Sequence, residues 1–229
     1  MLRVAEIFRS LQGEGLFAGT TSLFLRTTGC NLRCWFCDTP YTSWEPEGRQ
    51  RSWTDVLEEL LADDCQHVVI TGGEPLLQPN LVPLTRELQA AGRIITIETA
   101  GTVYRPVAAD LMSISPKLSN SQPSIDRSAR WAARHSRQRC KRPILQQLIA
   151  EYPAQLKFVI DQPADMTELE EFLDAPPPLP RDSVWVMPQA RTNAEIIAKS
   201  EWLIAAAETH GFRYSSRLHI EMFGNVRGR

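Results

Sequence analysis

Residues 22–39 read SLFLRTTGCNLRCWFCDT, and this stretch contains three cysteines with the spacing CxxxCxxC. The apolar and β-branched run Ser22–Thr27 predicts a strand, and Cys30, Cys34 and Cys37 follow it directly. A short loop at the end of that strand can therefore present three thiols in one place. Because thiolates are soft ligands, the pattern indicates an iron–sulfur cluster or a zinc site.

The remaining cysteines supply no evident fourth ligand. Cys65 and Cys140 stand far along the chain and are interpreted as small buried hydrophobes or free thiols, and the histidine closest to the loop is His67. A structural zinc site usually closes with four protein ligands, whereas a 4Fe-4S cluster can keep one iron open for a substrate or cofactor. Three thiolates therefore favour a single 4Fe-4S cluster, with a zinc site as the alternative.

Short apolar strands alternate with helical patterns along the rest of the chain. The predicted strands are Val4–Phe8, Ser22–Thr27, His67–Thr71, Ile94–Glu98, Leu111–Ser115, Leu156–Ile160 and Val184–Met187. The clearest predicted helices are Thr54–Ala62, Asn80–Ala91, Ala164–Leu173 and Ala194–His210, with Gly92 and Gly211 as signals for helix ends. This alternation predicts an α/β fold, an incomplete TIM-like barrel with a mainly parallel sheet, because there are too few helices for a full barrel. We expect one domain over residues 1–229, with Pro176–Pro180 as a stiff connector.

Composition excludes several classes of function. The chain has 229 residues and a formal net charge of −2, so it has no general attraction to nucleic acid or to an anionic membrane. No apolar run is long enough to cross a bilayer, and the first residues lack the apolar core of a signal peptide. We therefore expect a cytoplasmic protein.

One segment departs from this balance. Arg127–Arg142 contains seven Arg or Lys residues and no acid. We interpret it as a solvated helix face or a surface insertion. The alternative is a docking patch for an acidic partner, such as an electron-donor protein.

The cysteine spacing, together with Thr71-Gly72-Gly73-Glu74-Pro75 about 35 residues further on, resembles the radical S-adenosylmethionine (SAM) superfamily. The resemblance implies a 4Fe-4S cluster whose open iron is chelated by SAM, and reductive cleavage of SAM to a 5′-deoxyadenosyl radical. It also implies that the glycine-rich turn lets a ligand approach the backbone closely. The residues expected to contact SAM are Trp35, Phe36, Cys37, Gly72, Gly73, Glu74, Glu98, Ser115, Pro116, Lys117 and Lys157.

A narrower resemblance rests on Leu11-Gln12-Gly13-Glu14-Gly15 ahead of the cysteines, on Cys37-Asp38-Thr39 and on the tail Leu218–Asn225. These stretches are similar to the 7-carboxy-7-deazaguanine synthase family over nearly the whole chain. The family implies a radical ring contraction of 6-carboxy-5,6,7,8-tetrahydropterin to 7-carboxy-7-deazaguanine with loss of ammonia, an early step toward the deazapurine bases of tRNA such as queuosine. It also implies a dependence on Mg²⁺ and a homodimer.

This resemblance assigns substrate-binding and metal-binding roles. The residues expected to contact the pterin are Leu11, Gln12, Gly13, Glu14, Arg26, Thr71 and His219. The planar guanidinium of Arg26 suits bidentate binding of a carboxylate. Thr39 matches the position at which the family places a hydroxyl oxygen on Mg²⁺, a hard cation that prefers oxygen ligands.

Other interpretations remain open at this point. Arg26 can form a buried structural ion pair, Thr39 can cap a helix, and Lys157 can be a charge at a strand end. The bulky pair Trp35-Phe36 is unusual between the last two cysteines. For the whole chain, the alternatives are a glycyl-radical-activating enzyme, which shares CxxxCxxC, and a non-enzymatic zinc-binding module.

Overall fold

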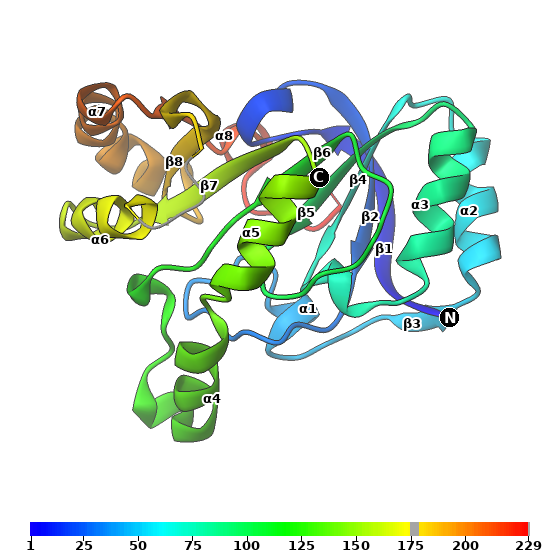
Figure 1. The fold of residues 1–229 in the computed structure, drawn as a ribbon, viewed down its shortest axis with the longest axis horizontal. Helices are drawn as coiled ribbons and strands as arrows, with labels where there is room; N and C mark the ends of the chain where they lie inside the picture. Colours follow the sequence, from blue (N-terminus) through cyan, green and yellow to red (C-terminus); the bar gives the residue numbers. More distant parts are fainter. Residues whose placement is uncertain (175–178, 229) are drawn as a thin grey trace.

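The computed structural model describes residues 1–174 and 179–228. Within these residues nine strands form one sheet in the order β3-β1-β2-β4-β5-β6-β7-β8-β9 (Figure 1). The strands are β1 (Leu2–Leu11), β2 (Thr21–Thr27), β3 (Arg49–Arg51), β4 (His67–Gly72), β5 (Ile94–Thr99), β6 (Leu111–Ile114), β7 (Ala154–Ile160), β8 (Val184–Pro188) and β9 (Arg213–Tyr214). β1 runs antiparallel to β2 and β3, and every other neighbouring pair is parallel. The predicted open, mainly parallel sheet is confirmed.

Helices follow most of the parallel strands. They are α1 (Pro40–Ser43), α2 (Trp53–Ala62), α3 (Leu81–Ala90), α4 (Ile125–Gln138), α5 (Arg142–Glu151), α6 (Ala164–Leu173), α7 (Asn193–His210) and α8 (Leu218–Phe223). Single 3-10 turns lie at Gly15–Phe17, Pro75–Leu77, Ser119–Ser121 and Arg181–Ser183. Gly211 takes the left-handed conformation at the end of α7, as predicted, with φ of 70°.

The predicted elements are present, and the structure adds others. All seven predicted strands and four predicted helices occur within three residues of their expected bounds. β3 and β9 were not predicted, because strands of two or three residues carry no readable alternation. α1 and α8 are similarly short; α4 lies in the basic segment, for which a helix was one of the two interpretations, and α5 follows that segment. The expected connector Pro176–Pro180 falls mostly outside the described residues.

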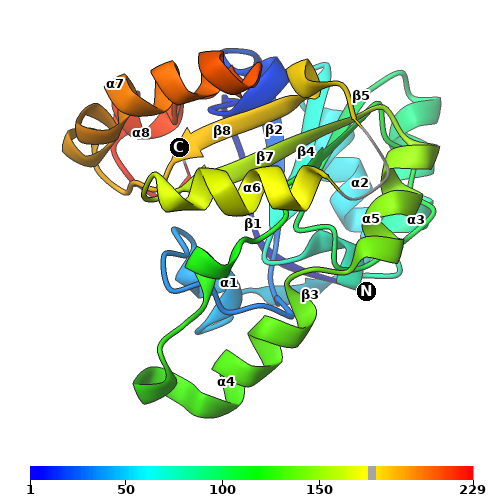
Figure 2. The same cartoon turned by 60° about the vertical axis from the view of Figure 1, so that its left-hand side comes forward.

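The core lies between the sheet and its outer helices. α2, α3, α5, α6 and α7 follow one another around the outside of the curved sheet (Figures 1 and 2). One hydrophobic cluster joins a leucine from each of these helices to the central strands, namely Leu60, Leu88, Leu148, Leu169 and Leu203 with Leu25, Ile70, Ile97 and Phe158. The opposite side of the sheet, away from these helices, is left for polar groups.

Among the described residues, no helix combines the length and the apolar character that a membrane span requires.

Two glycines seat the end of β4 against the start of the cysteine loop. Gly72 has φ of 126°, and a Cβ there would lie 2.0 Å from the carbonyl oxygen of Thr27. A Cβ on Gly73 would lie 2.3 Å from the carbonyl oxygen of Gly29. The sequence suggested that these glycines admit a ligand, and the structure shows that both also admit the backbone of the chain itself. The glycines are therefore required by the packing of backbone on backbone.

We expect Gly72→Ala to lower the free energy of unfolding by about 3 kcal/mol, since it adds both a positive-φ strain and a backbone clash. Gly92→Ala is the matched control, because Gly92 also has a positive φ of 77° but a Cβ there would meet no atom within 4 Å. That control should lose only about 1 kcal/mol. Urea unfolding under anaerobic conditions measures both values. Equal losses would show that the close approach at Gly72 is unimportant.

Candidate active site at the carboxyl edge of the sheet

A cavity of about 380 Å³ opens where the parallel strands end. It is closed by the loop after β2, by the residues that follow β1 and by the C-terminal tail. Most of the residues singled out from the sequence line it, namely Leu11, Gln12, Gly13, Glu14, Arg26, Cys30, Cys34, Phe36, Cys37, Thr39, Thr71, Gly72, Gly73, Glu98, Ser115, Lys117, Lys157 and His219. The carboxyl ends of parallel strands meet at one edge, which explains why residues so far apart in sequence come together.

Three of the expected SAM contacts do not line the cavity. Trp35 is 41% exposed, and its indole N–H donates to the carbonyl of Asn120 over 2.7 Å. Glu74 is fully buried, and its carboxylate accepts hydrogen bonds from the Thr99 hydroxyl at 2.8 and 2.9 Å and from two backbone N–H groups. Pro116 is buried away from the cavity lining. The Glu74 side chain ties the turn after β4 to the end of β5.

The cysteine loop presents three thiols to the cavity. Burial raises the pKa of the Cys30 and Cys34 thiols to about 12 and also raises the pKa of Cys37. Within the described ranges, no three His, Cys, Asp or Glu side chains form a set that can hold one metal ion. Three soft donors on one wall fit a cluster, in which each thiolate binds a different iron. Binding must release the thiol protons that burial favours.

Backbone carbonyls of this loop accept hydrogen bonds from a side chain of the loop itself and from side chains of other segments. Arg33 donates from Nη1 to two carbonyls of its own loop at 2.8 and 2.7 Å. The indole of Trp44 donates to the carbonyl of Cys34 at 2.9 Å, and Arg191 donates to the carbonyl of Cys37 at 3.2 Å. Because the loop forms no helix or strand, these bonds hold the cysteines in place. Sequence reasoning missed Trp44 and Arg191, and nothing in their local pattern marks them.

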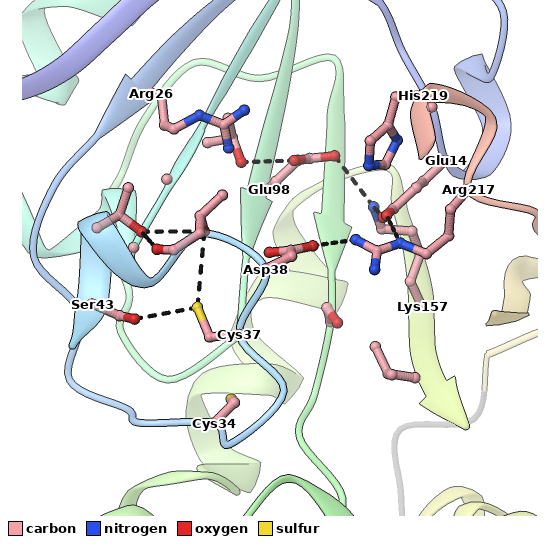
Figure 3. Close-up of a pocket in the computed structure, with 18 of the residues that line it drawn as sticks. Glu14, Arg26, Cys34, Cys37, Asp38, Ser43, Glu98, Lys157, Arg217 and His219 are labelled. Atoms are coloured by element: carbon pink, nitrogen blue, oxygen red, sulfur yellow. Dashed lines mark hydrogen bonds and ion pairs between the residues drawn. The ribbon is translucent and has the colours of Figure 1, made fainter. Parts of the chain in front are cut away.

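A chain of alternating charges crosses the floor of the cavity (Figure 3). Lys157 is 3% exposed, and its Nζ lies 3.2 Å from Glu98 and 2.9 Å from Glu14. Glu14 in turn accepts from Arg217 Nε at 3.1 Å, and Arg217 also bonds to Asp38. Asp38 and Arg217 were not among the predicted site residues. Their position beside Cys37 and close to His219 is the only sequence signal that pointed to them.

The charge chain keeps its members ionised. Burial would raise the pKa of Glu14, but Lys157 and Arg217 outweigh burial and hold that pKa far below its ordinary value. Burial likewise opposes the charge on Lys157, but Glu98 and Glu14 raise its pKa above the ordinary value. Lys157 also holds the pKa of Glu98 below its ordinary value against burial. At neutral pH the two carboxylates therefore act only as hydrogen-bond acceptors.

Arg26 faces the cavity and is braced from behind. Its Nε donates to Glu6 at 2.7 Å, so the ion pair considered from the sequence is present. No described residue accepts from the two Nη groups of Arg26, which remain available on the cavity side. Glu6 also accepts from the Tyr41 hydroxyl at 2.8 Å and from Arg227 at 3.3 Å. The Glu6 carboxylate therefore links the Arg26 guanidinium to Tyr41 and Arg227.

The C-terminal tail packs against the residues after β1. A Cβ on Gly13 would lie 1.9 Å from Nδ1 of His219, and the N–H of Leu218 donates to the carbonyl of Gly13 at 3.0 Å. Only glycine admits the tail so closely. Burial lowers the pKa of His219, so its imidazole is neutral at pH 7.

Thr39 stands at the start of α1, close to the cysteine loop. It holds the N-cap position of that helix, but its side chain makes no capping hydrogen bond. Its hydroxyl oxygen lies 3.9 Å from the sulfur of Cys37 and accepts from the Thr42 hydroxyl at 3.3 Å. The oxygen lines the cavity and retains a free lone pair for a cation.

The chain is similar to known proteins over almost its whole length. A family model described as the radical SAM superfamily matches residues 24–125. A 7-carboxy-7-deazaguanine synthase from Rhodopirellula baltica is 43% identical over 99% of this chain and 88% of its own length. The protein of that name from Halobacterium salinarum is 42% identical over 98% of this chain and 91% of its own length. The crystal structure of QueE from Escherichia coli superposes with a TM-score of 0.70 at 24% identity, covering 95% of this chain and 94% of that one, which shows a shared fold.

We expect Lys157→Met to lower the free energy of unfolding at pH 7 by about 3–5 kcal/mol, because Glu98 is then left buried without its cation. In the unaltered protein the depressed pKa values of Glu14 and Glu98 give stability that is present above the ordinary glutamate pKa and is lost as pH falls below it. The raised pKa of Lys157 gives stability that is lost only as pH rises above its ordinary value of 10.5.

In the Lys157→Met variant the pH dependence of stability that arises from Glu98 has the opposite sign. Without Lys157, burial raises the pKa of Glu98, so lowering the pH toward about 5 should narrow the difference from the unaltered protein. Urea midpoints at several pH values measure this. Arg9→Met is the control, because it removes an exposed pair with Asp63 and Asp64 and should change the midpoint little. A pH-independent loss in Lys157→Met would contradict the charge chain.

Proposed function

Because the chain belongs to the 7-carboxy-7-deazaguanine synthase family of radical SAM enzymes, we propose that it converts 6-carboxy-5,6,7,8-tetrahydropterin to 7-carboxy-7-deazaguanine with loss of ammonia. The observation that carries this proposal is that the three cysteines, residues 11–14 and Arg26 line one cavity. Relatives that match almost the whole chain do not favour a glycyl-radical-activating enzyme or a zinc-binding module.

The cysteine loop would hold a 4Fe-4S cluster through Cys30, Cys34 and Cys37. When bound, the reduced cluster and SAM supply the one-electron cleavage that starts the radical reaction. We assign the cavity wall beside the loop to SAM, where Phe36 offers an apolar face and Ser115 offers a hydroxyl. The Lys117 ammonium donates to the Ser115 hydroxyl at 2.6 Å, which orients that group.

We assign the other end of the cavity to the pterin. The free Nη groups of Arg26 match a carboxylate, and the brace from Glu6 at 2.7 Å fixes their direction. Glu98 remains ionised and accepts from Thr71 at 2.7 Å and from Gln12 at 3.2 Å, so it can accept N–H donors of a flat ring as well. A planar ligand rich in N–H donors and carrying a carboxylate satisfies both groups.

We propose that Mg²⁺ binds between Thr39 and the substrate. The Thr39 hydroxyl is a single neutral oxygen ligand, so substrate oxygens and water would complete the octahedron that Mg²⁺ requires. We further propose that an electron-donor protein such as flavodoxin reduces the enzyme. We also propose that the enzyme forms a homodimer. Five free thiols suit a reducing compartment such as the cytoplasm.

The direct test is anaerobic incubation of the reconstituted protein with 6-carboxytetrahydropterin, SAM, Mg²⁺ and dithionite. We expect 7-carboxy-7-deazaguanine, identified by mass spectrometry. Release of 5′-deoxyadenosine with the pterin left intact would contradict the proposed substrate.

We expect Cys34→Ala to abolish SAM cleavage, because the loop then offers two thiolates in place of three. Iron and sulfide content and the visible absorption of the anaerobic protein report cluster loading independently of activity. Cys140→Ala is the matched control, since Cys140 lies outside the cavity lining, and it should keep both loading and cleavage. Full loading in Cys34→Ala would refute the ligand assignment.

We expect Thr39→Ala to raise the Mg²⁺ concentration for half-maximal activity roughly tenfold while cluster content stays unchanged. Thr39→Ser keeps the hydroxyl and should retain the response of the unaltered enzyme. A titration of activity against Mg²⁺ measures both. The same Mg²⁺ response in the alanine variant would place the cation elsewhere.

A further inference from the structure

The inner face of α4 is fastened to the cysteine loop. His135 is fully buried, and its Nδ1 accepts from the backbone N–H of Arg33 at 3.1 Å, between the first two cysteines. Its Nε2 lies 2.9 Å from the Ser121 hydroxyl. The Arg33 guanidinium stacks over the Trp131 ring with its carbon 3.9 Å from the ring centre. In both views α4 lies beside α1 and the loop, away from the sheet (Figures 1 and 2).

The outer face of α4 carries positive charge without compensation. Arg130, Arg134 and Arg137 are exposed, and their spacing of four and three residues places them on one side of the helix. No carboxylate in the described part of the chain pairs with any of the three. Seven of the 25 Lys and Arg residues lie in Arg127–Arg142; Arg139 pairs with Glu168, and Asp126 in the first turn of α4 pairs with none of the three exposed arginines. A dense block of like charges is often an interaction segment.

An exposed tryptophan adjoins this helix. Trp35 lies between Cys34 and Cys37, is 41% exposed, and its backbone N–H donates to the Ser121 carbonyl at 3.2 Å. Ser121 is also the residue that contacts His135, so Trp35 and α4 share a support. Trp and Arg are the residues that dominate binding energy at protein interfaces. The cysteine loop and α4 together therefore present an exposed aromatic side chain and three cations without a carboxylate partner, of which Arg134 lies 4.9 Å from the Trp131 ring centre.

We propose that the surface formed by Trp35, Arg130, Arg134 and Arg137, here named the α4 face, docks a small acidic one-electron carrier protein. This inference rests on the proposed function, because radical SAM chemistry requires an electron from outside the enzyme. The carrier loses one electron and the enzyme gains it, and no atom is transferred. Charge complementarity selects an acidic protein, and the bond from His135 to Arg33 places the docked carrier beside the loop that would hold the cluster.

The test uses the reconstituted enzyme and its Arg130→Glu/Arg137→Glu variant, with flavodoxin as the probe. Neither Arg130 nor Arg137 contacts a partner among the described residues, so the circular dichroism spectrum and the iron content of the variant should be unchanged. Anaerobic calorimetry should show flavodoxin binding weakened by roughly tenfold or more at about 20 mM salt. At about 500 mM salt, where surface charges are screened, the unaltered enzyme should bind flavodoxin only slightly more tightly than the variant does. Turnover driven by flavodoxin and its reductase should fall, while turnover driven by dithionite stays the same.

Arg49→Glu/Arg86→Glu is the matched control, because it makes the same change in net charge at exposed arginines on β3 and α3 that, like Arg130 and Arg137, have no side-chain partner among the described residues. It should bind flavodoxin almost as the unaltered enzyme does. Equal weakening in this control, or unaltered binding in the α4 variant, would overturn the proposal. The proposal would also be overturned if the unaltered enzyme bound a tRNA transcript and the α4 variant lost that binding while its affinity for flavodoxin stayed unchanged. Failure of dithionite-driven turnover in the unaltered enzyme would instead count against the proposed function.

Discussion

The alternating charges of Glu98, Lys157, Glu14, Arg217 and Asp38 are the interaction on which the site depends. These side chains come from β5, β7, the segment after β1, the tail and the cysteine loop. A buried charge is tolerated only beside an opposite charge, so the five segments must meet in one arrangement. The chain of charges therefore fixes the tail and the cysteine loop relative to the strand ends and keeps the carboxylates ionised.

The cysteine loop is held by the same principle applied to backbone groups. Its carbonyls accept from Arg33, Trp44 and Arg191, and its N–H at Arg33 donates to His135. A loop without helix or strand structure needs such partners, because a buried carbonyl without a hydrogen bond is costly. Support from several separate elements leaves all three thiols on one wall of the cavity.

The two ends of the cavity differ in the hardness and the charge of the side chains that line them. Sulfur donors and an apolar ring lie at one end, while Arg26 and the carboxylate of Glu98 lie at the other. The Thr39 hydroxyl lies 3.9 Å from the sulfur of Cys37. The sulfur donors and the charged groups of Arg26 and Glu98 thus occupy different parts of one cavity (Figure 3).

The sequence alone determined the strand succession, the thiol loop, the glycine-rich turn and half of the cavity lining, because periodicity and motif spacing are local properties of the chain. It also determined the family, through stretches such as residues 11–15. Only the tertiary structure decided which charges pair, that Glu74 turns inward, and that the basic segment has a buried face at His135. Such pairings join residues as many as 221 positions apart, as for Glu6 and Arg227. Strand order and loop path set those encounters, and neither is written in the local pattern of hydrophobic residues.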